Sequence, residues 1–283
     1  MDKIRIKVAK TMKKMKLIAG LLITVLTLIT SCSKDPFTDD FVSDAYSIRS
    51  ASVDGKTREK FIYNNAGKIC EYQSFYFCQK FIYDNNDRLI KQEVAVDPNL
   101  ASSSMHTEKS ELMTSKNASF TGNYVYQYNN EGKLIAQKNY FKKSSLFEYT
   151  SMSSLVYDGN RIVTWNLHNA KDTITQFRTY EYDSKGNVSN EKYYSFLFIS
   201  GKEPKLISEV SYKYDDKNNP FRIYKDLGQP GLYTNPNNII ETNSVLYEDV
   251  PGIEKFSTSK TTYEYNDKGF PIKVNNSVEY KYD

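Results

Sequence analysis

Two histidines are the first side chains to test for chemistry, because catalysis and metal binding both favour imidazole. His106 stands in a polar stretch and His168 follows shortly after Trp165, and the two share no spacing typical of a metal site or of a nucleophile with its base. The chain also lacks a glycine-rich phosphate loop, and its carboxylates are typical of solvated strand faces. The sequence therefore predicts a protein that is not an enzyme and that binds neither a metal nor a cofactor.

An acidic segment, Asp84-Asn85-Asn86-Asp87, gathers oxygen atoms that could bind calcium. Arg88 follows it at once, however, and no glutamate closes a loop of the calcium-binding kind. Asp and Asn side chains also bond their own backbone in tight turns. We therefore interpret this segment as a turn.

Cys70 and Cys78 are placed symmetrically about Ser74. A chain reversal at Ser74 would set the two thiols opposite each other on adjacent strands, and a disulfide persists there if the protein leaves the cytosol. Residues 72–76 contain neither glycine nor proline to favour such a turn. A disulfide and a pair of buried thiols are both open interpretations.

The chain is rich in aromatic residues, with 24 tyrosines, 15 phenylalanines and one tryptophan. Flat aromatic faces can stack on sugars, but wide rings also fill the cores of pleated sheets. Most of these residues recur at regular positions, which favours the core interpretation. Trp165 and Tyr233 fall outside the period and are the candidate ligand-binding residues, for a glycan or a protein ligand.

The elements that must position these side chains are hairpins. A unit of the form aromatic-x-Tyr-Asx occurs eight times, with leucine in place of the first aromatic in one copy. The spacing puts the anchor tyrosine and the earlier aromatic on one face of a strand, and the Asx residue opens a turn. The anchor tyrosines are Tyr63, Tyr83, Tyr128, Tyr157, Tyr182, Tyr214, Tyr265 and Tyr282.

The position four residues after the anchor tyrosine supports a hairpin turn, because its occupants tolerate a positive φ. They are Gly67, Asp87, Gly132, Gly186, Asn218 and Gly269. We therefore expect an all-β fold in which successive antiparallel hairpins form one large twisted sheet, with room to curl or partly close. We expect one β-repeat domain over residues 51–283.

The residue between the two aromatic positions reports on the opposite face of the sheet. It is Ile62, Ile82 or Val156 in three early copies and polar or charged in the later ones. We therefore expect the second face to be covered in the N-terminal part and open to water further on. Two long gaps, residues 93–123 and 225–260, are expected to be loops, and the second is the place where we expect function.

Residues 1–31 have the parts of an export signal, with seven basic residues ahead of a 13-residue apolar run at 17–29. That run is shorter than the roughly 20 residues of a membrane-spanning helix. It ends in Ile29-Thr30-Ser31-Cys32, which resembles the lipobox of bacterial lipoproteins and implies a lipid on Cys32, so the membrane is the expected partner of that residue. The alternative is an ordinary secretory signal with a stray cysteine. Residues 32–50 are polar and acidic, which predicts a flexible tether.

Charge argues against a nucleic-acid partner. Residues 1–31 carry seven basic side chains and one acidic side chain, a net charge of +6, whereas the whole chain carries +4. The remainder therefore has a net charge of −2 and lacks the clustered basic surface that nucleic acids require.

The Tyr-x-Tyr-Asp-x-x-Gly units resemble the YD repeats of RHS-type proteins, which implies a long coiled β-sheet that acts as a shell or spacer. Asn219-Pro220-Phe221 and Gly269-Phe270-Pro271 resemble segments of uncharacterised Bacteroidetes lipoproteins of the domain-of-unknown-function kind. Cys32-Ser33-Lys34-Asp35 partly resembles the sequences that send such lipoproteins to the cell surface. These resemblances imply a location and a β architecture, and no reaction.

The sequence thus predicts a lipid-anchored protein of the outer membrane, with the cell surface favoured over the periplasmic face. The preferred function is a non-catalytic binding or scaffold module. The alternative is a structural shell or spacer with no small ligand.

Overall fold

The computed structural model describes residues 47–98, 111–197, 203–247 and 254–283. The predicted signal, Cys32 and His106 lie outside these residues. The described residues belong to one compact unit. Its first described strand, β1 (Ile48–Val53), starts inside the predicted tether, and the side chain of Ile48 is fully buried. The folded part therefore begins before residue 51, earlier than predicted.

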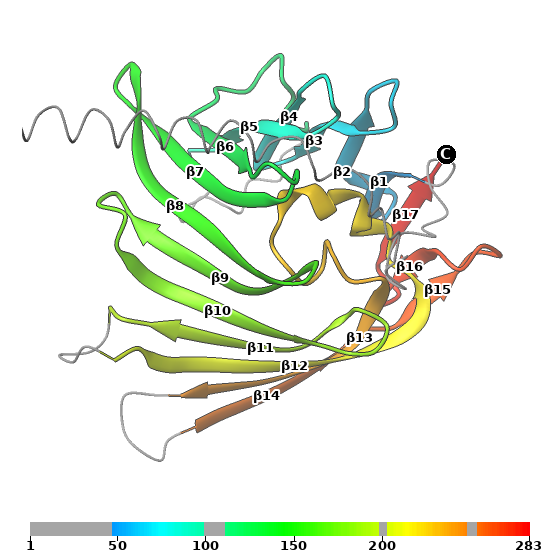
Figure 1. Ribbon diagram of the computed structural model, residues 1–283. Coiled ribbons are helices and arrows are strands. Elements are labelled where there is room, and N and C mark those ends of the chain that lie inside the picture. The colour runs from blue at the N-terminus through cyan, green and yellow to red at the C-terminus, as the bar shows by residue number, and fades with distance from the viewer. Residues whose placement is uncertain (1–46, 99–110, 198–202, 248–253) are drawn as a thin grey trace, which may run out of the picture. The chain divides into compact units, whose positions relative to one another are not determined.

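The unit is a single sheet of 17 antiparallel strands (Figure 1). After β1 come β2 (Lys56–Tyr63), β3 (Ile69–Ser74), β4 (Phe77–Tyr83), β5 (Leu89–Val96), β6 (Gly122–Tyr128), β7 (Leu134–Lys143), β8 (Leu146–Asp158) and β9 (Arg161–Asn169). The others are β10 (Ile174–Tyr182), β11 (Val188–Ser195), β12 (Lys205–Asn218), β13 (Asn237–Tyr247), β14 (Glu254–Lys260), β15 (Tyr263–Tyr265), β16 (Pro271–Val274) and β17 (Val278–Tyr282). The prediction of an all-β fold built from successive hairpins is confirmed.

The strand order brings the first and last strands together. Strands β1 to β14 pair in chain order, while β1 also pairs with β17, β17 with β16, and β16 with β15. Beside the β1–β17 pair, the guanidinium of Arg49 forms an ion pair with the carboxylate of Asp283. The ends of the order are β14 and β15, which leaves the sheet curled around a concave face but not closed (Figure 1).

Six hairpin turns share one hydrogen-bond pattern. In each, the Asx side-chain oxygen accepts hydrogen bonds from the backbone amides two and four residues later, and the fourth residue of the five has a positive φ. Five of these turns are the predicted ones. They begin at Asn64, Asp84, Asn129, Asp183 and Asn266.

The sixth turn and one predicted turn depart from the sequence pattern. The sixth begins at Asn169, where His168 stands in the place of the anchor tyrosine, so the motif did not reveal it. The predicted turn after Tyr214 does not form, and the prediction is wrong there. Asn218 has no positive φ and instead ends β12, because Asn219 begins a helix.

The anchor tyrosines connect neighbouring hairpins through their hydroxyl groups. In seven of the eight, the hydroxyl donates a hydrogen bond of 2.5 to 2.9 Å to a backbone carbonyl near the start of the preceding strand; we call these bonds hydroxyl latches. The exception, Tyr265, donates to the carboxylate of Asp215. The hydroxyl explains why the anchor position holds tyrosine and never phenylalanine.

The outer, convex face is less covered than the sequence predicts. Ile62 and Val156 remain 38% and 48% exposed. Residues 111–121 instead cover this face near Glu71 and Cys78. The amide of Ser115 in this segment donates a 2.8 Å hydrogen bond to the carboxylate of Glu71. The prediction that these positions mark a covered face is therefore wrong at Ile62 and Val156, whereas Ile82 is partly buried.

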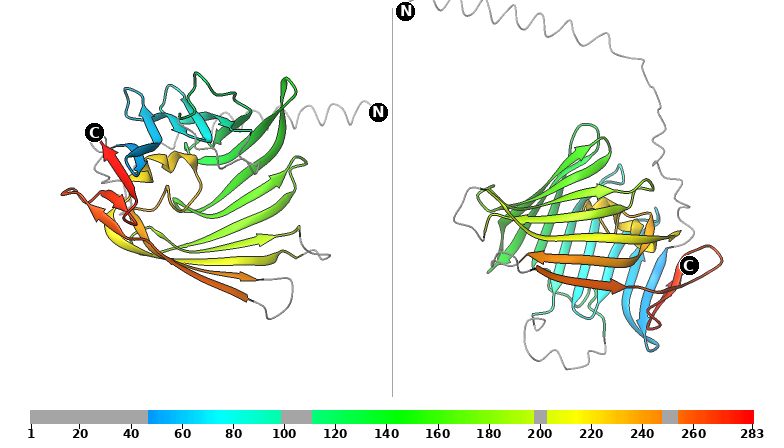
Figure 2. Two further views of the ribbon diagram at one scale, coloured as in Figure 1. Left: turned by 180° about the vertical axis from the view of Figure 1, so that it is seen from behind. Right: turned by 90° about the horizontal axis from the view of Figure 1, so that it is seen from below.

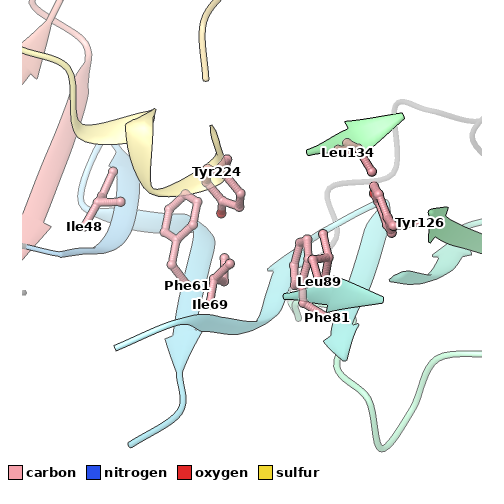
Figure 3. Close-up of a cluster of buried hydrophobic side chains, with 8 residues drawn as sticks. All are labelled: Ile48, Phe61, Ile69, Phe81, Leu89, Tyr126, Leu134 and Tyr224. Carbon is pink, nitrogen blue, oxygen red and sulfur yellow. The ribbon is translucent and has the colours of Figure 1, made fainter. Parts of the chain in front are cut away.

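The predicted loop at residues 225–260 is wrong as well, since β13 and β14 occupy its second half. The first part of this gap, residues 225–236, continues from residues 219–224. Residues 219–236 together are here called the inserted segment, which lies on the concave side of the sheet (Figure 2). It contains the 3₁₀ helix η1 (Pro220–Leu227). Tyr224 from this helix joins the buried cluster formed by the sheet residues Phe61, Phe81 and Leu134 (Figure 3).

Candidate functional site

A cavity of about 630 Å³ lies between the inserted segment and the concave face of the sheet. Its walls come from β1, β2, β3, β4, β13, β15, β16 and β17 together with the inserted segment. Eight of the lining side chains are aromatic, among them Phe61, Tyr72, Tyr224 and Tyr233. The volume and the mainly apolar lining are typical of a small-molecule site.

The ends of the inserted segment are fixed by buried asparagines. The side-chain oxygen of Asn219 accepts a 3.0 Å hydrogen bond from the amide of Phe221 and so caps η1. Its amide nitrogen donates to the carbonyls of Leu232 and Asn235 at 2.5 and 2.9 Å. Asn219 thus holds the start of the segment against its end.

A second asparagine ties the segment to the sheet. The side-chain oxygen of Asn235 accepts a 2.9 Å hydrogen bond from the amide of Val188, and its nitrogen donates to the hydroxyl of Tyr214 at 3.0 Å. Asn219 and Asn235 are only 2% and 1% exposed. Because both buried side-chain amides form hydrogen bonds through their oxygen and their nitrogen, they hold the inserted segment in a defined position.

Gly228 allows the segment to approach the sheet closely. It ends η1 with a φ of 78°, and a Cβ at this position would lie 2.3 Å from Cδ2 of Leu134. Both the backbone conformation and the contact therefore require glycine. The signals for η1 were present in the sequence, as an asparagine, a proline at the first helical position and a closing glycine.

Tyr224 is the most deeply buried tyrosine of the inserted segment, with 6% of its surface exposed. Its ring centroid lies 6.1 Å from that of Phe61, 6.1 Å from that of Phe81 and 5.2 Å from that of Tyr233. Within the described residues its hydroxyl has no hydrogen-bond partner. Burial raises the pKa of Tyr224 well above its usual value, so the hydroxyl stays protonated.

Most polar side chains of the cavity wall already have partners. The carboxylate of Glu59 accepts a 2.9 Å hydrogen bond from the hydroxyl of Tyr72, and the side-chain oxygen of Gln79 accepts one of 3.0 Å from Gln92. Asn238 donates to the carboxylate of Asp215. The charged lining residues are Arg58 and Glu59.

The two candidate ligand-binding residues lie in different surroundings. Tyr233 lines the cavity, in agreement with the prediction that it belongs to a ligand-binding site. Trp165 lies on β9 and does not line it. The guanidinium of Arg178 sits 5.4 Å from the Trp165 ring and 4.8 Å from the Tyr193 ring, which gives Trp165 a structural contact across the strands.

Of the two open interpretations of Cys70 and Cys78, the structure has the pair of free thiols, with Cys78 buried and Cys70 half-buried. The chain reverses between Phe75 and Tyr76, so Cys78 pairs with Gln73 and not with Cys70. The hydroxyl of Ser74 stabilises this reversal by accepting a hydrogen bond from the amide of Phe77 at 3.0 Å. Cys70 and Cys78 consequently lie on opposite faces of the sheet.

The other candidate residues for chemistry, Asp84 and His168, form hydrogen bonds within hairpin turns. Asp84 binds its own turn and the guanidinium of Arg88 at 2.7 Å, as the turn interpretation predicts. Nε2 of His168 lies 2.8 Å from the hydroxyl of Ser154, and its Nδ1 lies 3.1 Å from the carbonyl of Asp172. In the part of the chain that the structure describes, no group of three or more His, Cys, Asp or Glu residues is placed to hold a metal.

None of the described helices has the length and apolar character needed to cross a membrane.

No protein-family profile and no curated protein matches the sequence. Among solved structures, the chain is similar to a porin-like protein from Bacteroides vulgatus, with 11% identity, 84% of this chain and 99% of that chain covered, and a TM-score of 0.49. A porin-like protein from Bacteroides uniformis has 11% identity, covers 85% and 99%, and has a TM-score of 0.36. A DUF3836 family protein from Parabacteroides distasonis has 13% identity, covers 48% and 89%, and has a TM-score of 0.21. At these TM-scores the similarities carry no argument about function.

Proposed function

We propose that this protein is a non-catalytic binding lipoprotein, held in the outer membrane by a lipid on Cys32 and displayed at the cell surface. The observation that carries the binding role is the aromatic-lined cavity of about 630 Å³ with Tyr233 in its wall. Small-molecule sites typically have volumes of about 300 to 1,000 Å³ and a few polar groups in an apolar lining. The buried asparagines support this role because they hold one wall of the cavity in place.

The lining suits binding better than chemistry. A reaction needs a nucleophile, an acid or a base held against the substrate. The charged groups of the cavity are Arg58 and Glu59, and the side chain of Arg58 lies 5.2 Å from the ring of Phe75 while Glu59 is bonded to Tyr72. His168 is bonded within a turn and does not line the cavity.

A structural shell or spacer of the YD-repeat kind is the second candidate. The hydroxyl latches favour it, because they join hairpin to hairpin along the sheet with regular geometry. A spacer needs this stiffness and needs no ligand. The cavity is the feature that a spacer does not explain.

Ligand binding separates the two candidates. The full-length protein in detergent micelles is tested against a glycan array and, by thermal unfolding, against a panel of small apolar compounds. We expect at least one class to bind, with binding weakened by Tyr233→Ala and unchanged by Trp165→Ala, since only Tyr233 lines the cavity. If no glycan and no apolar compound binds, the structural spacer becomes the better supported function.

The anchor and its location are tested in cells. Cys32→Ala should release the protein from the membrane fraction, and unchanged association would refute lipid anchoring. Protease added to intact cells should digest the wild-type protein if it faces outward. Digestion only after the outer membrane is opened would place it on the periplasmic side.

A further inference from the structure

We propose that the free edge of β14 pairs with the same edge of a second copy of this chain, antiparallel and about a two-fold axis at Ser257. The sheets of the two copies then continue into one another. This interaction surface is separate from the cavity, which no residue of β14 lines.

The first support is that the edge of β14 is long and regular. β14 stands at one end of the strand order and pairs only with β13, and it forms the lower margin of the sheet in Figure 1. Folded proteins usually protect such an edge by a short strand, a bulge or a proline. β15, at the other end of the order, has only 3 residues. β14 has 7 residues, all exposed, with no proline and no bulge against β13.

The pairing with β13 determines which backbone groups of β14 point to the free edge. The amide of Thr261 donates a 3.0 Å hydrogen bond to the carbonyl of Ile240, so the backbone groups of Thr261 point toward β13. In an antiparallel pair, residues that point toward the partner strand alternate with residues that point away from it. The residues of β14 that point to the free edge are Glu254, Phe256, Thr258 and Lys260.

One register lets two copies use the whole of this edge. It places Glu254 of one copy opposite Lys260 of the other, and Phe256 opposite Thr258. Every residue that points outward then faces another that points outward. Each of these four pairs exchanges two backbone hydrogen bonds, about eight in all. Ser257 lies on the two-fold axis, opposite Ser257 of the second copy.

Charge favours the same register. Glu254 and Lys260 meet twice across the two-fold axis, and Lys255 lies opposite Ser259, so no like charges face each other. The ammonium of Lys260 lies 3.9 Å from the carboxylate of Glu241 in its own chain and is 74% exposed, which leaves room for a second carboxylate. A parallel pairing in register would instead place each of these charges opposite its own copy, which is unfavourable.

The exposed ring of Phe256 gains a partner in this arrangement. It is 72% exposed in the single chain. In the paired edges it lies diagonally across from Phe256 of the second copy, a separation of about 7 to 8 Å that aromatic side chains can span. The interface is smaller than that of a permanent dimer, so we expect the association to be reversible.

Disulfide trapping tests the pairing in the full-length protein, held in micelles that outnumber the protein. Cys70→Ser removes the more exposed of the two described thiols. In this background, Ser257→Cys should form a covalent dimer when copper phenanthroline is added as oxidant, because paired residues on the axis lie about 4.5 Å apart. A disulfide spans Cα atoms separated by about 4.4 to 6.8 Å.

Ser259→Cys is the matched control, because Ser259 is exposed on the same face of the same strand. In the proposed register it lies roughly 13 Å from Ser259 of the second copy, too far for a disulfide. We therefore expect a covalent dimer on a non-reducing gel from Ser257→Cys and little or none from Ser259→Cys.

A charge exchange tests the register independently. Added to Ser257→Cys, Glu254→Lys should slow dimer formation about two- to thirtyfold, because two attractive pairs become two repulsive pairs. Adding Lys260→Glu as well restores opposite charges at both positions and should restore the rate.

Several results would overturn the inference. Equal trapping of Ser257→Cys and Ser259→Cys would show random collision, and faster trapping of Ser259→Cys would show another register. No covalent dimer from Ser257→Cys would remove the second copy as the occupant. Failure of the charge exchange to restore the rate would show that Glu254 and Lys260 do not face each other. In cells, a disulfide from Ser257→Cys to a different protein would make that protein the occupant.

Discussion

The hydroxyl of Tyr128 donates a 2.7 Å hydrogen bond to the backbone carbonyl of Leu89, the first residue of β5. Tyr128 ends β6, and the turn that follows it leads into β7. The bond therefore joins one hairpin to the hairpin before it. Along the rest of the sheet the same relationship recurs at the other latches.

Removing one latch should weaken the fold by a modest amount. We expect Tyr128→Phe to lower the free energy of unfolding by about 1 to 2 kcal/mol, because the carbonyl of Leu89 loses its partner while the ring stays in place. Chemical denaturation of the purified protein measures the change. Tyr180→Phe is the matched control and should be neutral or stabilising, since its buried hydroxyl has no partner to lose. Equal losses in both variants would contradict a stabilising role for the hydrogen bond from Tyr128 to Leu89.

Gly228→Ala should be much more harmful than an equivalent change in a hairpin turn. Gly228 and Gly132 have φ values of 78° and 80°, so alanine strains the backbone at both by about 1 to 2 kcal/mol. Only at Gly228 would the new Cβ meet another side chain, 2.3 Å from Leu134, whereas nothing lies within 4 Å at Gly132. Overpacking adds about 1 to 3 kcal/mol. Thermal or denaturant unfolding of both variants gives the difference, and a difference of zero would contradict the close approach of the inserted segment.

The packing of residues 111–121 against the sheet should depend on pH, because the amide of Ser115 is bonded to the carboxylate of Glu71. Burial alone would raise the pKa of Glu71, but hydrogen bonds from Gln73, Ser115 and Cys78 outweigh it and hold the pKa below the ordinary value of 4.5. The stabilisation is therefore fully present above pH 4.5 and is lost as the pH falls through the lower, folded-state pKa.

Hydrogen exchange at the amide of Ser115 measures this effect, because that amide donates directly to the carboxylate. We expect its protection to fall on acidification while amides in the centre of the sheet stay protected. In Glu71→Gln the side chain no longer ionises, and the dependence on pH should disappear. Protection that is constant from neutral to acidic pH in the wild type would contradict the role of Glu71.

The two thiols should differ in reactivity. Cys78 is fully buried, and burial together with nearby Glu71 raises its pKa to about 12, while Cys70 is half-buried. We expect iodoacetamide to modify Cys70 before Cys78 in the folded protein, and both after unfolding without reductant. Mass spectrometry of the peptides detects each adduct. Failure to alkylate either residue in the unfolded protein would restore the disulfide.

The hairpins could be predicted from the sequence because their determinants are local. An Asx residue and an αL-tolerant residue three positions later suffice to form a turn, and five of the six predicted sites have the expected positive φ. The exception at Asn218 depends on Asn219-Pro220, which starts a helix and overrides the turn. The turn at Asn169 lacked a tyrosine and was missed for that reason.

The site was only partly predictable, because its walls meet through long-range packing. Tyr233 drew attention as an aromatic outside the repeat, and it lines the cavity. Tyr224 was missed, since nothing local shows that it packs on Phe61 and Phe81, which lie far away in the sequence. The sequence signal that was available was the helix itself, framed by Asn219, Pro220 and Gly228.

The inserted segment also limits how many hairpins such a chain can have. A hydroxyl latch needs only the strand before it and would by itself permit any number of repeats. Residues 219–236, however, contact Phe61 on β2, Leu134 on β7 and Val188 on β11. A hairpin gained between these strands would displace one contact by two strand widths, roughly 10 Å. A chain of this kind that gains a repeat must therefore rebuild residues 219–236 at the same time.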